Sequence, residues 1–332
     1  MNKPVIAFVT GGYSSEAVIS YKSAITIEKN LDTSKFDIYR IDITPELWFH
    51  PSASGEKIPV KRDDFTIEIN GKSIKFDAVF IGIHGTPGED GKLQGYFDLL
   101  NLPYTSCDAT SSAITFNKRY TTAVAGASGF HVAKSVHIFK NTFKIDDVWS
   151  KNLKLPVFVK PNNGGSSIGM SRVNENDELP SAIEKAFKED DQVLIEELIV
   201  GREFTIGVFK SKGAVITLPF TEIITENEFF DFEAKYQGKS KEVTPAECSQ
   251  DTAEKVRKAA AGIYSVFNCR GVVRMDFIFN EIDKMPYLLE INTVPGQSAA
   301  SIVPQQVAAM GVNLTDFYTM LIEEALVVEK NK

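Results

Sequence analysis

Apolar and polar residues alternate along two stretches near the C-terminus, residues 271–279 and 287–292. Successive residues of a strand point to opposite sides of a sheet, so this period of two predicts two β-strands. The apolar face of the first strand consists of Val273, Met275, Phe277 and Phe279. The polar face consists of Arg274 and Asp276 on the first strand and Glu290 and Asn292 on the second. The pattern therefore predicts a hairpin with one buried face and one face that can carry chemistry.

The spacing of the two strands predicts which polar residues oppose each other. If residues 280–286 form a symmetric hairpin loop, Asp276 opposes Glu290 and Arg274 opposes Asn292. Two carboxylates would then lie about 5 Å apart at Cβ, which is destabilising unless a cation lies between them. Asp, Glu and Asn oxygens suit Mg²⁺ that is shared with substrate phosphates. A solvated strand face is the alternative, and the apolar flanking residues argue against it.

The first third of the chain alternates predicted strands with predicted helices. Strands are expected at residues 4–10, 36–43 and 78–83, and helices at 14–31 and 92–100. Ser14 or Ser15 is placed to cap the first helix. Strand and helix in alternation predict an open α/β layer, which is expected to end near residue 103.

Two further segments follow this layer. The second is expected to contain a helix at residues 111–128 and strands at 156–160, 170–173 and 192–197. The third is expected to contain a strand at 203–209 and a helix at 252–267, whose apolar face is Val256, Ala260, Ile263 and Phe267. At 332 residues the chain exceeds the usual size of one core. We therefore expect three domains at residues 1–105, 106–197 and 198–332.

A glycine-rich stretch, residues 162–169, follows Lys160 and lies between two predicted strands. Backbone N–H groups of such a loop can bind phosphate oxygens, and Ser166 and Ser167 would add hydroxyl donors. The loop could equally be a flexible turn, but a lysine in a buried strand needs an anionic partner. The chain has neither a P-loop motif nor the glycine fingerprint of a nicotinamide-binding domain after its first strand.

Composition narrows the class of protein. Hydrophobic residues make up 43% and charged residues 24% of the chain, as in an ordinary soluble globular protein. The net charge of −8 and the lack of a basic run argue against a nucleic-acid partner. No stretch approaches the ~18 apolar residues that a membrane helix needs. Three cysteines without metal-binding spacing fit a reduced cytoplasm.

The motifs of the chain, taken in order, resemble those of the D-alanine–D-alanine ligases of the ATP-grasp superfamily. The resemblance covers nearly the whole chain and rests on residues 11–16, 84–95, 160–169, 232–236, 274–276 and 290–296. It implies an ATP-grasp fold of α/β class with an N-terminal open α/β domain of Rossmann-like type.

The resemblance implies that the protein joins two D-alanines for peptidoglycan precursors. The carboxylate of the first D-alanine would attack the γ-phosphate of ATP, and the amine of the second would displace phosphate from the resulting acyl phosphate. Such chemistry depends on positioning and charge neutralisation more than on a protein nucleophile. The family also implies two Mg²⁺ ions, for which Mn²⁺ can substitute, and a homodimer. Glu290 would bind both ions, Asp276 one and Asn292 the other.

The family assigns the remaining residues to ATP and to the two D-alanines. The ATP residues would be Lys118, Lys160, Ser166, Ser167, Glu196, Glu197, Ile199, Glu203 and Lys235. The D-alanine residues would be Glu16, His84, Arg274, Gly296, Ser301 and Ile302. Arg274 and the Gly296 N–H would also stabilise the developing oxyanion. Glu16, Ser166 and Tyr236 would form a triad that closes the site and keeps water from the acyl phosphate.

Several of these residues have simpler explanations when the family is set aside. Glu16 also suits a helix N-terminus, and His84 suits a hydrogen-bonded residue at the end of a strand. Glu197 replaces a lysine that relatives often carry, Phe230 replaces a tyrosine, and residues 297–301 differ from the usual sequence. Two rival functions remain open. One is a ligase of the same fold that makes a D-lactate ester or accepts D-serine, and Tyr236 disfavours the lactate type. The other is a nucleotide-binding module without ligase chemistry, which the paired Asp276 and Glu290 disfavour.

Overall fold

The N-terminal segment forms a five-stranded sheet in the order β4-β3-β2-β1-β7. The computed structural model describes residues 3–144, 152–164, 168–225 and 240–328. β1 pairs in parallel with β2 and with β7, as the open α/β prediction requires. The elements of this segment are β1 (Val5–Gly11), α1 (Ala17–Asn30), β2 (Asp37–Ile43), β3 (Trp48–Pro51), β4 (Lys57–Pro59), β5 (Ile67–Ile69), β6 (Lys72–Ile74), β7 (Ala78–Ile81) and α2 (Lys92–Leu99).

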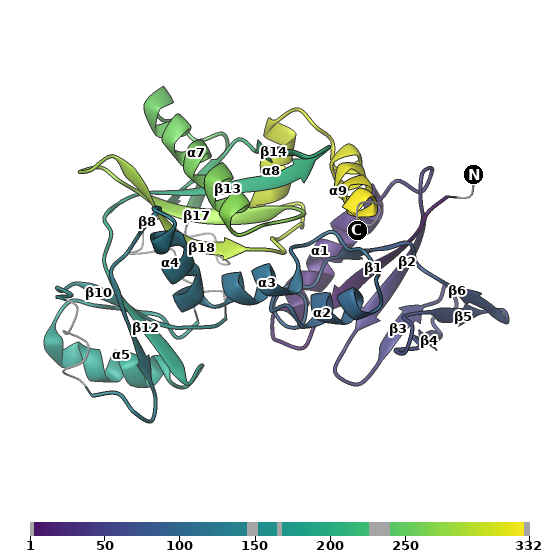
Figure 1. Cartoon of the computed structure of the whole chain (residues 1–332), viewed down its shortest axis with the longest axis horizontal. Coiled ribbons are helices and arrows are strands. Elements are labelled where there is room, and N and C mark those ends of the chain that lie inside the picture. Colours follow the sequence, from purple (N-terminus) through teal and green to yellow (C-terminus); the bar gives the residue numbers. More distant parts are fainter. Residues whose placement is uncertain (1–2, 145–151, 165–167, 226–239, 329–332) are drawn as a thin grey trace.

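A smaller antiparallel sheet, in the order β11-β10-β12-β9, forms the central unit. Its elements are β9 (Ser135–Phe139), β10 (Val157–Pro161), β11 (Ser171–Val173), the 3₁₀ helix η2 (Asn176–Glu178), α5 (Leu179–Ala186) and β12 (Gln192–Glu197). α5 packs its apolar face against this sheet. Figure 1 shows the central unit and the N-terminal sheet at opposite ends of the molecule.

The third sheet lies along the order β16-β15-β13-β17-β18-β8, with β14 paired to β13. Its elements are β8 (His131–Val132), β13 (Gly201–Ser211), β14 (Ala214–Thr217), β15 (Thr221–Thr225), β16 (Ser240–Val243), α7 (Gln250–Val266), β17 (Val273–Asn280) and β18 (Met285–Asn292). Val273, Met275, Phe277 and Phe279 are all buried against α7, as the alternation predicts. The polar face of the same hairpin therefore points away from the core.

The C-terminal helices connect the third sheet to the N-terminal one. α8 (Ile302–Ala309) and α9 (Leu314–Val328) contribute to a core that also contains residues of β1, α1 and β7. Within it, the rings of Phe80 and Tyr318 meet edge to face at 5.4 Å between centroids. The first and third segments therefore share one core, so loops from both can meet at a fixed distance.

The junction of the segments holds two helices where the sequence predicts one. α3 (Ala109–Phe116) ends at Asn117, whose backbone is extended and whose side chain accepts a hydrogen bond from Tyr120 N to start α4 (Lys118–Ala127). The single helix predicted at 111–128 is therefore wrong. α3, α4 and β8 pack into the core of the third sheet, although the sequence places them in the second domain.

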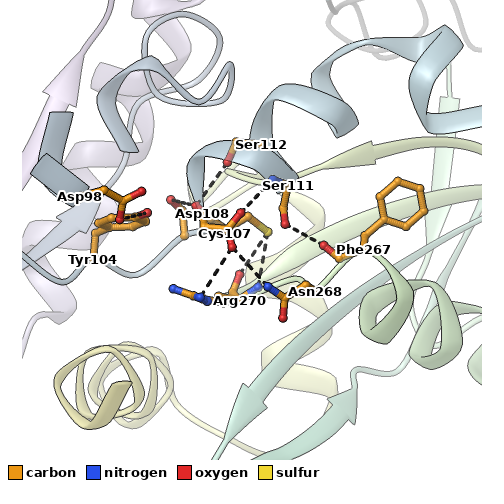
Figure 2. A network of polar contacts seen from close by, with 10 residues as sticks. Asp98, Tyr104, Cys107, Asp108, Ser111, Ser112, Phe267, Asn268 and Arg270 are labelled. Carbon is orange, nitrogen blue, oxygen red and sulfur yellow. Dashed lines mark hydrogen bonds and ion pairs between the residues drawn. The ribbon is translucent and has the colours of Figure 1, made fainter. Parts of the chain in front are cut away.

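Figure 2 shows how the start of α3 is tied to the third segment. Asp108 caps α3, forms an ion pair with Arg270 at 3.6 Å and accepts a hydrogen bond from Asn268. The buried Cys107 thiol exchanges weak hydrogen bonds with the Arg270 backbone, and Ser111 donates to the Phe267 carbonyl. Of the described helices, none is long and apolar enough to cross a membrane.

Candidate active site

Two cavities meet at the polar face of the β17–β18 hairpin. The first, of about 390 Å³, lies between the N-terminal and third segments, and the second, of about 570 Å³, lies between the central unit and the third sheet. Both are lined by Glu203, Ile223, Asp276 and Glu290. A molecule in one cavity can therefore approach a molecule in the other across these side chains.

The hairpin register agrees with the prediction at the site but not near the turn. Asp276 opposes Glu290 and Arg274 opposes Asn292, as predicted. Pairing continues to Asn280 opposite Met285, so the symmetric loop that the prediction assumed is wrong. A bulge between Asp276 and Phe277 shifts the register by one residue and restores the predicted pairs. The extra residue of the bulge is Leu289, and its insertion determines which side chains of β18 point into the cavities.

Arg274 holds the two facing carboxylates together. Its Nε and Nη2 donate to the two oxygens of Asp276 at 3.0 and 2.8 Å, and Nη2 lies 3.6 Å from Glu290 Oε1. Thr205 also donates to Asp276, and Asn292 Nδ2 lies 3.5 and 3.4 Å from Asp276 and Glu290. Burial opposes the charge of Arg274, but the two carboxylates outweigh it and raise the pKa of the guanidinium.

His84 lines the first cavity but has both ring nitrogens engaged. Nδ1 lies 2.6 Å from the Val294 carbonyl and Nε2 lies 2.8 Å from Ser23 Oγ. Burial is the main reason that the pKa of His84 falls to about 4, and the charge of Arg274 adds to it. His84 is therefore neutral at pH 7 and hydrogen-bonded, in line with the simpler of its two explanations.

Glu16 lies at the start of α1 and also lines the first cavity. It occupies the N-cap position without a side-chain cap, whereas Ser14 Oγ accepts from Glu16 N, so neither predicted serine is the N-cap residue. A side chain at Gly85, whose φ is +67°, would collide with the Glu16 carboxylate and with Ser14 Oγ. The glycine therefore allows the carboxylate to lie close to the loop that carries His84.

Glu89 also lines the first cavity, although no role is predicted for it from the sequence. Its two carboxyl oxygens accept from Gly85 N at 2.7 Å and from Val294 N at 3.1 Å, so it joins loops of the first and third segments. Burial, with the charge of Glu16 second, raises its pKa to about 8. Its place in the motif at residues 84–95 was the only signal in the sequence.

The loop after β18 brings three more predicted residues to the first cavity: Gly296, Ser301 and Ile302. Ser301 Oγ accepts from Ser298 N at 3.0 Å and lies 2.8 Å from Ser298 Oγ. A side chain at Gly296 would approach Ser301 Oγ to 2.8 Å. These contacts hold Ser298 and Ser301 close to Gly296 at the cavity wall.

The second cavity collects the described residues that the family assigns to ATP. They are Lys118, Lys160, Glu196, Glu197, Ile199 and Glu203. Lys160 and Glu196 form a buried ion pair at 2.5 Å on adjacent strands, which gives the lysine the anionic partner that the sequence demands. Lys118 Nζ donates to Gly164 O at the entrance of the glycine-rich loop, and Glu197 accepts from Lys134 N.

Four predicted residues, Ser166, Ser167, Lys235 and Tyr236, lie outside the described residues, as does Phe230. Ser23 and Gln297, which contact the loops around the first cavity, were missed because neither belongs to a recognisable motif. Among the described residues there is no group of three or more His, Cys, Asp or Glu side chains arranged to hold a metal ion.

Comparisons with known proteins agree with this arrangement. The family model "D-ala D-ala ligase N-terminus" matches residues 5–107, and "D-ala D-ala ligase C-terminus" matches residues 125–323. A D-alanine–D-alanine ligase of Flavobacterium johnsoniae is 45% identical over 97% of this chain and 99% of its own. The corresponding enzyme of Phocaeicola vulgatus is 43% identical over 97% of this chain and 99% of its own.

Solved structures show the same fold. The VanG D-Ala:D-Ser ligase of Enterococcus faecalis superposes with a TM-score of 0.87 at 32% identity, over 98% of this chain and all of that one. A D-alanine–D-alanine ligase of Bacillus anthracis complexed with ATP superposes with a TM-score of 0.79 at 28% identity, over 99% of both chains. The predicted resemblance and the predicted ATP-grasp fold are thus confirmed. The chain belongs to the D-alanine–D-alanine ligase family.

Proposed function

We propose that this chain joins two D-alanines into D-alanyl-D-alanine for peptidoglycan synthesis, with ATP converted to ADP and phosphate. One observation carries the proposal. The paired carboxylates Asp276 and Glu290 form a wall common to a cavity large enough for a nucleotide and a smaller cavity lined by Glu16 and Arg274. Phosphoryl transfer to a carboxylate needs this arrangement, because the two substrates must meet in line at the γ-phosphate.

The reaction proceeds in two displacement steps. The carboxylate oxygen of the first D-alanine forms a bond to the γ-phosphorus, and the bond from that phosphorus to ADP breaks. The amine of the second D-alanine, after losing a proton from its ammonium form, then bonds to the acyl carbon, and phosphate leaves. Neither step requires a covalent bond to the protein. The role of the protein is therefore to bind, align and neutralise charge.

The second cavity suits ATP. Lys160 has two N–H donors besides the one directed at Glu196, and it binds phosphate oxygens together with Lys118. The backbone at Glu196, Glu197 and Ile199 presents hydrogen bonds and apolar surface to adenine. Glu203, which faces both cavities, accepts hydrogen bonds from the ribose hydroxyls.

Asp276, Glu290 and Asn292 fit two Mg²⁺ ions, with Mn²⁺ as a substitute. Asn292 lies within 3.5 Å of both carboxylates, and the set offers only oxygen ligands once the amide of Asn292 is turned. When bound, Mg²⁺ would neutralise charge on the transferring phosphoryl group. Glu290 would be the ligand common to both ions.

The first cavity suits the two amino acids. Glu16 receives the ammonium group of the first D-alanine. Arg274 uses Nε and Nη2 for Asp276, so Nη1, which has no hydrogen bond to the described residues, binds the carboxylate of the second. The Gly296 N–H stabilises the oxyanion, Ser301 adds a donor to the second carboxylate, and Ile302 provides apolar surface. The triad of Glu16 with Ser166 and Tyr236 stays a prediction, because two of its members lie outside the described residues.

D-Serine is the second candidate for the second site, because a D-Ala:D-Ser ligase is among the similar solved structures. We further expect a homodimer that works in the cytoplasm, where ATP is available. The test is to incubate the protein with ATP, Mg²⁺ and a panel of D- and L-amino acids and D-lactate, and to identify products by mass spectrometry. D-Alanyl-D-alanine as the main product is expected. If D-alanine fails to stimulate ADP formation, the proposal is wrong.

A further inference from the structure

The turn formed by residues 294–297 is held at both ends by side chains of the N-terminal segment. The Val294 carbonyl accepts from His84 Nδ1 at 2.6 Å, and Gln297 N donates to Ser23 Oγ at 3.1 Å. Ser23 Oγ lies 2.8 Å from His84 Nε2. Two side chains in series therefore bridge the turn and span Gly296.

The direction of each hydrogen bond follows from its partners. A carbonyl oxygen only accepts, so His84 Nδ1 must carry the proton that it shares with Val294. The ring is neutral at pH 7, so His84 Nε2 has no proton and must accept the hydroxyl proton of Ser23. One tautomer of His84 is therefore selected, and its ring has no polar atom left for a substrate.

The side chain of Gln297 closes the turn from the other side. Its Nε2 donates to the Pro295 carbonyl at 3.2 Å, and its Oε1 accepts from Tyr318 Oη at 3.2 Å. Gln297 is only 4% exposed and Tyr318 is fully buried in the core between the first and third segments. A buried polar side chain destabilises the fold unless its polar atoms are hydrogen-bonded. Both polar atoms of the Gln297 side chain have a partner.

We infer that Ser23, Gln297 and Tyr318 are positioning residues that fix the direction of the Gly296 N–H through hydrogen bonds to its own peptide group, at the Pro295 carbonyl, and to the two peptide groups that flank it. Within the described residues the Gly296 N–H has no partner, and Gly296 lines the first cavity. The inference rests on the proposed function, which gives this N–H to the oxyanion. It also changes the role of His84, which acts through the loop rather than by contact with D-alanine.

The inference predicts a specific kinetic change. Loss of an oxyanion donor typically lowers kcat about 100- to 1000-fold, and a donor that is merely misaligned should cost less. Ser23→Ala and Gln297→Met should therefore lower kcat for dipeptide formation roughly ten- to hundredfold. The KM for ATP should stay within about twofold, because neither Ser23 nor Gln297 lines the second cavity.

Two neighbouring buried residues offer a matched pair of variants. Tyr318→Phe removes only the hydroxyl that donates to Gln297. Thr319→Val removes the next hydroxyl along α9, whose Oγ1 has no hydrogen-bond partner in the part of the chain that the structure describes. Tyr318→Phe should lower kcat and Thr319→Val should not, although both change a buried hydroxyl on the same helix.

The decisive experiment combines these kinetics with ¹⁵N NMR of the His84 ring. In the wild-type protein we expect the tautomer with the proton on Nδ1, and in Ser23→Ala a mixture of tautomers together with the fall in kcat. A wild-type ring protonated on Nε2 would overturn the inference even if Ser23→Ala does not fold. Dipeptide formation by Tyr318→Phe at the Thr319→Val rate would also overturn it. A wild-type protein that forms no D-alanyl-D-alanine would instead refute the proposed function.

Discussion

Protonation of His84 should be strongly opposed by the folded protein. Its pKa falls from 6.5 to about 4 because the ring is buried, 6% exposed, and lies near the charge of Arg274, while the hydrogen bond to the Val294 carbonyl offsets only part of the fall. At about 1.4 kcal/mol for each pH unit, this difference corresponds to roughly 3 kcal/mol. The histidine pKa is lower in the folded state than in the unfolded state. The contribution of neutral His84 to the free energy of unfolding is therefore fully present above pH 6.5 and is lost as pH falls through about 4.

Glu89 acts in the opposite direction over part of this range. Its pKa rises from 4.5 to about 8, so the folded state prefers the protonated carboxyl, and that preference is lost as pH rises through about 8. The two effects overlap between pH 4.5 and 6.5. The variant His84→Gln keeps a donor and an acceptor but cannot titrate. The difference between the free energies of unfolding of the wild type and this variant, measured across the pH range, therefore gives the contribution of His84 alone.

The assay is NMR of the histidine Cε1–H signals between pH 8 and 4. The chain has four histidines, so one of four signals should be missing in His84→Gln and is thereby assigned. That signal should stay at its neutral position down to about pH 5. A midpoint at or above about pH 6 would refute the reasoning, since a ring that protonates so easily cannot be held between Ser23 and Val294 as the structure has it.

Two further variants test the walls of the two cavities. Gly85→Ala places a methyl group against the Glu16 carboxylate, so we expect a higher KM for D-alanine and a lower melting temperature. Gly71→Ala is the control, because Gly71 has a similar φ of +73° and a methyl group there would meet no atom within 4 Å. It should lower the melting temperature only through the unfavourable backbone conformation and leave the KM for D-alanine unchanged. Lys160→Met leaves Glu196 buried without its partner, which should lower the free energy of unfolding by about 3–5 kcal/mol. A free energy of unfolding in urea within about 1 kcal/mol of the wild-type value would contradict the ion pair between Lys160 and Glu196.

The polar face of the hairpin could be predicted because strand alternation is a local property. Val273 and Asp276 are placed on opposite faces by the chain itself, whatever packs around them. The register was predicted correctly for an incomplete reason. A tighter turn, with Asn280 opposite Met285, and a bulge that leaves Leu289 without an opposite residue compensate each other. Neither the tighter turn nor the bulge can be recognised in the sequence, because the residues that form them look like ordinary strand residues.

The boundaries of α3 and α4 show where local reasoning ends. Asn117 interrupts an otherwise helical pattern because its side chain caps the second helix, and Asn is also common on helix surfaces. The family resemblance supplied the ligand residues, and the structure brings the described ones to two adjoining cavities.

Ser23, Glu89 and Gln297 could not be predicted from the sequence. Ser23 looks like an ordinary residue of an amphipathic helix, and its partners lie 61 and 274 positions away along the chain. Glu89 looks like a solvated loop acid until Val294 is brought to it by the core between the first and third segments. Contacts of such sequence separation depend on the packing of whole elements and leave no local pattern.

We propose above that ATP and D-alanine meet at the carboxylate pair of the hairpin, Asp276 and Glu290. The most direct test is to titrate Mg²⁺ while measuring D-alanine-dependent ADP release by the wild type and by the double variant Asp276→Ala, Glu290→Ala. We expect saturable activation of the wild type and no measurable turnover in the variant, because its metal ligands are gone. A variant that keeps the wild-type Mg²⁺ dependence and rate would contradict this proposal.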